Sequence, residues 1–302
     1  MLPLRLRRGL FGLSNRNPDE NNQNNENNND NDSSGEQPQP SSLSKPDPDT
    51  ENFFPTLWDV LKVRYMLQWK LKKLVPPELV DTIIDQAEYW PSTKHVMEGQ
   101  RRILWDRDQV LFKTVPLCFD RKSLEEVESP KPLPHRTAHP CRKIIFHLSS
   151  HDQGGSRIHE NMYQGSFTWF DVEVIREAHK KRMYVDGAEQ EILEDETGKV
   201  KRHFEPSDEL LLPRSRQLQM NGARVSETQD RVIIWHYLDN VSSESTEAHD
   251  IERTEGRGRY TLDGQFVREL EIGDSVALWG RARFGQWANH VFQASARVFW
   301  AV

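Results

Sequence analysis

Cysteine is scarce in this sequence, and long apolar runs are missing from it. Only Cys118 and Cys141 occur among the 302 residues, which is too few for the disulfide framework of a small secreted domain. No apolar run approaches the roughly 20 residues that cross a bilayer. The sequence therefore predicts reduced thiols, no transmembrane segment and an intracellular location, cytoplasmic or nuclear.

Short motifs of catalysis and cofactor binding are also absent. The chain contains no G-x-S-x-G nucleophile elbow, no G-x-x-x-x-G-K-[ST] phosphate loop and no H-E-x-x-H helix. Its net charge of −7 does not favour nucleic acid as the main partner, because phosphate binding needs a basic surface. We therefore expect no cofactor and favour a protein that is not an enzyme.

Apolar side chains are almost absent from the N-terminal part, which is rich in Asn, Asp and Pro. Residues 15–50 carry too few of them to offset the entropy lost on ordering, so we predict a disordered tail over residues 1–52. The first 16 residues contain four arginines, and no acid occurs before Asp19. That composition also suits a mitochondrial presequence, so import is an alternative.

Residues 53–103 are predicted to form a small helical segment. Apolar residues recur at helical spacing from Leu57 to Leu74, and lysines occupy the other positions, as in a basic amphipathic helix. We expect this helix to pack on the main domain, with its lysine stems covering apolar surface. Binding to a membrane or to a partner helix is the alternative.

A second helix is predicted after Pro76 and Pro77, within residues 74–91. Its sequence, PPELVDTII, resembles the opening helix of an F-box, which implies a substrate adaptor that joins a Skp-type subunit of a cullin ubiquitin ligase. The following residues do not supply the later leucine-rich helices of an F-box. The candidate partner-helix residues are Leu79, Val80, Ile83 and Ile84.

From residue 104 to residue 302 the periodicity changes to the two-residue alternation of β-strands. Clear examples are RKIIFHLSS, TWFDVEV, RVIIWHY and DSVALWG. Strands with few helices between them predict a mainly β fold, a β-sandwich or jelly roll. Two long polar spans, 177–202 and 241–258, are predicted to be insertions that are partly disordered or carry one short helix each.

The loop that follows RKIIFHLSS is the first candidate site. It contributes His151, Asp152 and Gln153, and loops at strand ends commonly carry binding residues. A metal-dependent hydrolase that uses His151, Asp152 and Asp171 is one alternative, although strand periodicity does not make these residues converge. In the structural alternative, Asp152 bonds the backbone of a turn that Gly154 and Gly155 complete.

A second candidate set lies near the C-terminus, where arginine and tryptophan alternate. Arginine stacked on indole is a recurrent ligand platform, and alternation puts Trp279, Arg281 and Arg283 on one face. A solvated ladder on the sheet surface is the structural alternative. The full set of candidates is Trp279, Arg281, Arg283, Trp287, Asn289 and His290.

Four segments within residues 77–302 resemble successive motifs of a family of uncharacterised filamentous-fungal proteins with a C-terminal β-sandwich module. They are RKIIFHLSSHDQGGS, YQGSFTWFDVEV, LQMNGARVSETQDRVIIWHYLD and FVRELEIGDSVALWGRARFGQWANHVFQASARVFWAV. Some members attach the module to ankyrin repeats or to an F-box-like segment. Two positions depart from the family pattern: Gly155 stands where a Trp is usual, and no Pro separates Phe284 from Gly285. The resemblance implies a fold and no established activity, substrate or cofactor.

These observations favour a non-enzymatic interaction module whose partner is a protein, a peptide or a glycan. Polar donors and aromatic faces on the two candidate loops are suited to hold such a ligand.

Overall fold

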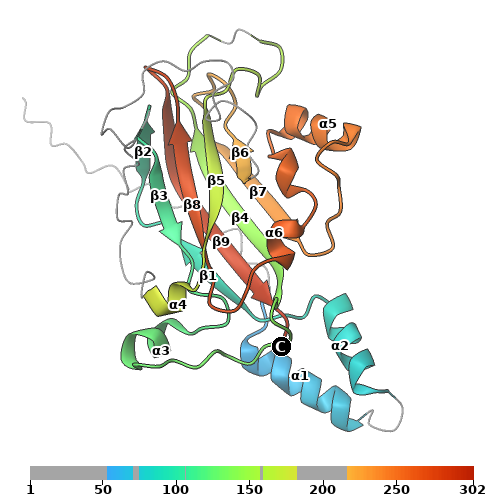
Figure 1. Cartoon of the computed structure of the whole chain (residues 1–302). Helices are drawn as coiled ribbons and strands as arrows, with labels where there is room; N and C mark the ends of the chain where they lie inside the picture. Colours follow the sequence, from blue (N-terminus) through green and yellow to red (C-terminus); the bar gives the residue numbers. More distant parts are fainter. Residues whose placement is uncertain (1–52, 71–74, 106, 157–158, 182–215) are drawn as a thin grey trace, which may run out of the picture. The chain divides into compact units, whose positions relative to one another are not determined.

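The computed structural model describes residues 53–70, 75–105, 107–156, 159–181 and 216–302. The predicted disordered tail lies outside these residues, and so does most of the predicted insertion at 177–202. The described part contains two antiparallel β-sheets preceded by a small helical segment (Figure 1). The predicted mainly β fold is therefore confirmed.

Sheet A has the strand order β1-β9-β4-β7, and β2 also pairs with β9. Sheet B has the order β3-β8-β5-β6. The bounds in sheet A are β1 Ser92–Val96, β2 Arg101–Leu104, β4 Cys141–His151, β7 Gln229–His236 and β9 Ala288–Trp300; those in sheet B are β3 Gln109–Lys113, β5 Thr168–Ile175, β6 Gln217–Met220 and β8 Ser275–Ala282.

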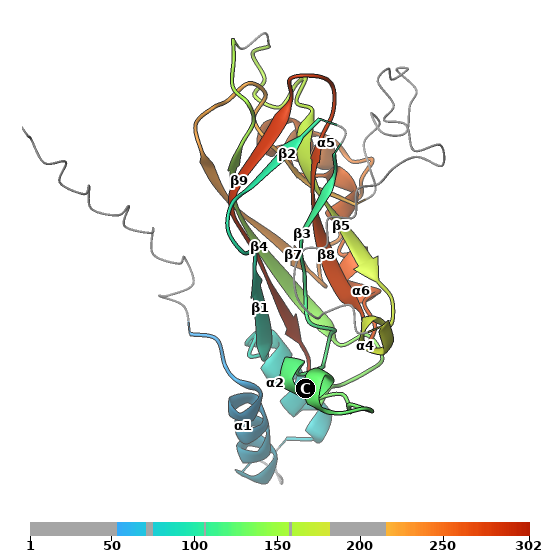
Figure 2. The ribbon, with the colours of Figure 1, turned by 90° about the vertical axis from the view of Figure 1, so that its left-hand side faces the viewer.

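These strand orders are those of a jelly roll. β1 and β2 pair with consecutive parts of β9, at residues 295–299 and 288–291, so together they act as one interrupted edge strand. If they are counted as strand one, the sheets read 1-8-3-6 and 2-7-4-5, which is the jelly-roll arrangement of two sheets. Figure 2 shows the two sheets from the side.

The β domain begins earlier than the predicted boundary at residue 104. β1 and β2 lie inside the segment expected to be helical. Their short polar sequences, STKHV and RRIL, carry weak strand signals of their own. They become strands by pairing with β9, nearly 200 residues later, and such a long-range pairing is not visible in local periodicity.

The core lies between the sheets and follows the predicted alternation. Ile144, Phe146 and Leu148 of β4 are fully buried, while the residues between them are half-buried. Phe146 packs edge-on against Trp235 of β7, with ring centroids 5.1 Å apart. On sheet B, Gly280 is required because an added Cβ would lie 2.7 Å from the Ile103 side chain.

Helices α1, Leu57–Lys70, and α2, Pro77–Gln86, pack against each other and against the core. Val80 and Ile84 of α2 are buried, whereas Leu79 and Ile83 are exposed. Val80 and Ile84 are therefore core residues, which corrects their prediction as partner-binding residues. Consecutive helix residues are about 100° apart, and positions 80 and 84, which are four apart, share the face that packs into the core.

Charged contacts hold α2 to the domain. Arg136 forms ion pairs with Asp81 at 3.2 Å and with Asp85 at 2.5 Å, and the Trp90 indole donates to Asp85 at 2.8 Å. The residues after α2, where an F-box continues with helices, form β1 and β2 instead. The adaptor interpretation gains no support from this arrangement.

The remaining helices connect strands. They are α3, Arg121–Glu126; α4, Ala178–Lys181; α5, Thr246–Glu255; the 3₁₀ helix η1, Arg259–Thr261; and α6, Gln265–Arg268. α5 is the short helix expected in the 241–258 insertion; it starts at a Ser245 cap and ends at Gly256 in the left-handed conformation. Within the described ranges, no helix is both long and apolar enough to cross a membrane.

Both cysteines are free and buried. Burial raises the pKa of the Cys118 thiol, with a further contribution from nearby Cys141, and it raises the pKa of Cys141 to about 12. Both groups are therefore held as thiols, which are poor nucleophiles.

Candidate functional site

The two loops that carry the candidate residues meet at one end of the sandwich. His151, at the end of β4, stacks on His290 of β9, with ring centroids 4.8 Å apart. The next loop residue but one, Gln153, accepts a hydrogen bond from the Ala288 backbone N–H at 3.1 Å. Figures 1 and 2 both show the β4–β5 loop and the β8–β9 loop at the end away from α1 and α2.

Asp152 forms the turn that the structural alternative predicted. It is fully buried, and its carboxylate accepts hydrogen bonds from the Gly154 N–H at 2.8 Å and from the Arg224 N–H. Burial raises the pKa of this carboxyl, and the backbone donors only partly oppose that effect. Gly154 has φ of +77°, a conformation that favours glycine. Asp152 therefore shapes the loop and does not contact solvent.

The β8–β9 loop, which crosses from sheet B to sheet A, carries backbone strain at its tip. Phe284 and Gln286 both have positive φ, +67° and +75°, which is uncommon for residues with a side chain. Gly285 lies between them, and an added Cβ there would meet nothing within 4 Å. The tip of the β8–β9 loop thus faces open space, and Phe284 and Gln286 adopt a backbone conformation there that their side chains disfavour.

Three half-buried aromatic side chains pack together beside this tip. Phe167 meets Phe284 at a ring-centroid distance of 4.6 Å and Trp287 at 5.2 Å, with both pairs of rings at 88°. We name Phe167, Phe284 and Trp287 the loop-end cluster. Both contacts are T-shaped, with the edge of one ring against the face of the other.

The stacked histidines form one side of the same region. Burial lowers the pKa of His290, and the neighbouring His151 and Arg102 lower it further. Phe292 packs on His151 at 5.3 Å. A neutral His290 ring can both donate and accept a hydrogen bond.

Trp279, Arg281 and Arg283 are not a solvated ladder or an open platform, because each is only 3% exposed. The Arg283 guanidinium binds both Asp108 carboxylate oxygens, at 2.5 and 2.7 Å. Arg281 binds Asp108 at 2.7 Å and Asp171 at 2.8 Å. These carboxylates come from distant segments, and their charges allow the arginines to be buried.

The predicted stacking of arginine on indole does occur, but within this buried network. The Arg281 guanidinium lies 4.6 Å from the Trp279 ring centroid, and that of Arg283 lies 5.1 Å from Trp169. Burial alone would raise the pKa of Asp108, but the hydrogen bond from Arg283 and the charges of both arginines outweigh it and hold the pKa below its usual range. The network is structural.

Asn289 is also buried and structural. Its amide donates to the Trp169 carbonyl oxygen at 3.2 Å, and its Oδ1 accepts from the Asn221 amide at 2.9 Å. Asn221 in turn bonds Ser150 and Thr168. This chain joins both sheets beneath the loops and fixes the positions of the strands that carry them.

The residues of the hydrolase alternative are engaged separately. Asp152 binds backbone N–H groups, whereas Asp171 on sheet B binds Arg281 and the Trp169 indole. Among the residues that the structure describes, no group of three or more His, Cys, Asp or Glu side chains is placed to hold a metal ion.

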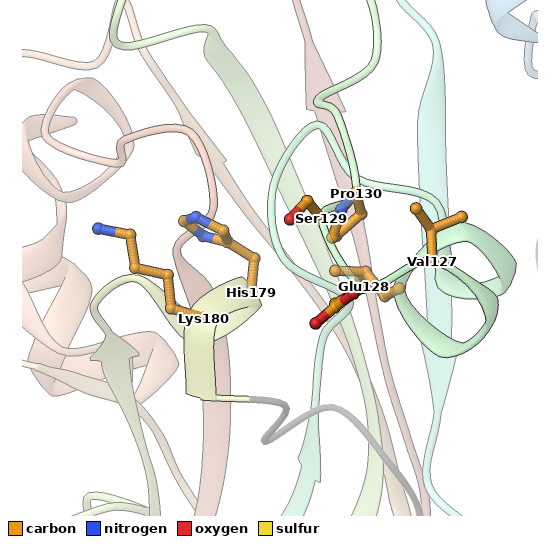
Figure 3. Close-up of a pocket in the computed structure, with 7 residues that line it drawn as sticks. Val127, Glu128, Ser129, Pro130, His179 and Lys180 are labelled. Atoms are coloured by element: carbon orange, nitrogen blue, oxygen red, sulfur yellow. The ribbon is translucent and has the colours of Figure 1, made fainter.

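A pocket of about 250 Å³ lies at the other end of sheet B. Figure 3 shows Val127, Glu128, Ser129 and Pro130 on one side of it and His179 and Lys180 on the other. The His179 ring is engaged in stacking on Phe119 at 4.7 Å, and most of the other lining residues are exposed. This pocket brings no buried polar groups together, so the loop-end cluster is the stronger candidate site.

Comparison of the chain with protein-family models, with curated proteins and with solved structures found no match.

Of the predicted ligand residues, the structure brings His151, Gln153, Trp287 and His290 to one rim and buries the others. Sequence reasoning missed Phe167 and Phe284 as site residues. Phe167 lies three residues before the buried Phe170, so strand alternation places the two on opposite faces, and this was the available signal. Its contact with Phe284, more than 100 residues later, could not be read from either segment.

Proposed function

We propose that this protein is a non-enzymatic interaction module that binds an apolar side chain of a protein or peptide partner at the loop-end cluster. The observation that carries the proposal is the half-buried loop-end cluster, in which the Phe167 ring packs at 88° against the rings of Phe284 and Trp287. Aromatic clusters of this kind supply most of the binding energy in protein interfaces when a partner side chain fills them.

The ring geometry favours a peptide over a glycan. A sugar ring stacks best on a flat, accessible aromatic face, whereas the rings of this cluster are half-buried and pack edge-to-face on one another. The strained β8–β9 loop adds support. Phe284 and Gln286 are held in backbone conformations that cost free energy, and many proteins retain such conformations at binding sites.

Polar residues lie in the same part of the chain as the cluster, as expected for the rim of an interface. Gln153 is fixed by its hydrogen bond to the Ala288 N–H, and His290 is fixed by its stack on His151. Because these groups are already ordered, little rotamer entropy is lost when a ligand binds.

A displayed random-peptide library tests the proposal with the full chain as bait. We expect enrichment of peptides with one large apolar residue, and Trp287→Ala should weaken their affinity by roughly tenfold or more, with an unchanged melting temperature. Trp58→Ala, which removes an exposed tryptophan on α1, is the matched control and should leave binding intact.

Three outcomes would contradict the proposal. These are a library without enrichment, selected peptides that bind Trp287→Ala as well as the parent chain, and binding to a glycan array alone that Trp287→Ala abolishes. The last outcome would assign the same cluster to a carbohydrate.

A further inference from the structure

Helix α1 is apolar on two opposite sides. On the inner side Val60 is fully buried, and Leu57, Leu61 and Leu67 pack against the core. Such contacts fix the helix to the β domain. An ordinary surface helix would be polar on its outer side, and α1 is not.

The outer side carries an aromatic stripe of Trp58, Tyr65 and Trp69. Their side chains are 77%, 64% and 64% exposed. The spacing of seven and then four residues puts all three on one side of the helix, opposite Val60. At 1.5 Å per residue the stripe extends roughly 16 Å along the axis, so one flat surface can contact all three rings together.

The charges on this side are basic. Lys62 lies within the stripe by helical spacing and is exposed, and the Lys70 ammonium lies 5.6 Å from the Trp69 ring centroid. The one carboxylate of the helix, Asp59, is engaged at the N-terminus by the Thr56 hydroxyl at 2.7 Å and backbone N–H at 3.0 Å.

We propose that the aromatic stripe of α1 binds the surface of an anionic lipid bilayer, with the helix lying parallel to the membrane plane. Tryptophan and tyrosine favour the headgroup region, where the ring is apolar and its N–H or O–H stays hydrated. Lysines beside them pair with anionic headgroups while their stems stay in the interface. The combination of aromatic rings and cations on a single convex side matches a flat anionic surface.

The arrangement in the fold supports this orientation. α1 and α2 lie where β9 ends, since Phe54 before α1 packs on Phe299 at 5.8 Å, while the β8–β9 loop lies where β9 begins (Figure 1). A bilayer bound at α1 therefore leaves the loop-end cluster accessible. The membrane proposal stands independently of the peptide proposal.

Vesicle flotation of the full chain tests the inference, with phosphatidylcholine vesicles and vesicles that also contain phosphatidylserine. We expect binding to the anionic vesicles that weakens with added salt. Trp58→Ser/Trp69→Ser should lower the partition coefficient at least tenfold, because two interfacial rings are lost. Lys62→Gln/Lys70→Gln should lower it about thirtyfold, since each basic residue contributes on the order of a fivefold increase.

The double variant Val232→Ser/Ile234→Ser is the matched control, because it removes two exposed apolar residues of β7. It should bind vesicles like the parent chain, and circular dichroism should show that every variant is folded. The proposal fails if the parent chain does not float with anionic vesicles, if it binds neutral vesicles equally well, or if the control loses as much binding as the tryptophan variant.

Discussion

At the scale of single residues, burial separates binding side chains from structural ones. Arg283→Ala removes a guanidinium that binds both oxygens of buried Asp108. We expect a loss of roughly 3 to 5 kcal/mol in the free energy of unfolding, because the carboxylate is left with one cationic partner in a poorly solvated site. Urea unfolding measures the loss.

Trp287→Ala is the comparison for that experiment, because Trp287 is half-buried at the rim. Its loss should change the unfolding free energy by less than about 1 kcal/mol. If Arg283→Ala were as stable as Trp287→Ala, the buried network would not stabilise the fold.

His95 gives the molecule a pH-dependent stability. Its Nε2 accepts a hydrogen bond from the Val115 N–H at 2.9 Å, which requires the neutral ring. Burial, and secondly the charge of Arg121, lower its pKa to about 4. In the unfolded chain the pKa of this histidine is about 6.5, so the unfolded state binds the proton at a higher pH than the folded state does. The stabilisation is therefore complete above about pH 6.5 and is lost as the pH falls toward 4.

His95→Gln should remove this dependence, since the glutamine oxygen can accept the same hydrogen bond without titrating. Relative to the parent chain, His95→Gln should gain roughly 3 kcal/mol of unfolding free energy between pH 7 and pH 4, because only the parent loses this stabilisation. His139→Gln, at an exposed position, should leave the pH dependence of the parent chain unchanged. A constant difference between parent and His95→Gln over this range would contradict the assignment.

At the scale of elements, α2 offers a direct test because one of two consecutive isoleucines is buried and the other is exposed. Ile84 is 2% exposed and Ile83 is 43% exposed. Ile84→Ala should cost roughly 2 to 4 kcal/mol of unfolding free energy through the cavity that it leaves, whereas Ile83→Ala should cost less than about 1 kcal/mol. Thermal and urea unfolding of the two variants measure the difference, and equal losses would show that α2 is not docked as described.

Strands were predictable from the sequence where their own alternation matches the pattern of burial. They were not predictable where pairing with a distant segment determines that a strand forms. The alternation in RKIIFHLSS predicted β4 because one face of that strand is buried. β1 and β2 carry no such pattern and are defined by β9. The buried arginines were misjudged for a similar reason: alternation assigned them to one face correctly, but the carboxylates that neutralise them lie on other segments.

At the scale of the whole β domain, strand β9 separates the two proposed surfaces. It runs for 13 residues from Ala288 to Trp300, roughly 40 Å in an extended strand. The loop-end cluster lies at its beginning and helix α1 lies near its end. A jelly roll alone does not specify a function, but its two ends can carry two separate binding surfaces.

This separation predicts that the two activities are lost independently. Trp287→Ala should weaken binding of a library-selected peptide roughly tenfold and leave vesicle binding unchanged. Trp58→Ser/Trp69→Ser should weaken vesicle binding and leave peptide affinity unchanged, because sites this far apart with no shared contacts contribute additively. Peptide titration in the presence of anionic vesicles completes the test. If either variant weakened both activities in a folded protein, the surfaces would be coupled or would be one surface, and the assignment of a separate site to each end of β9 would be wrong.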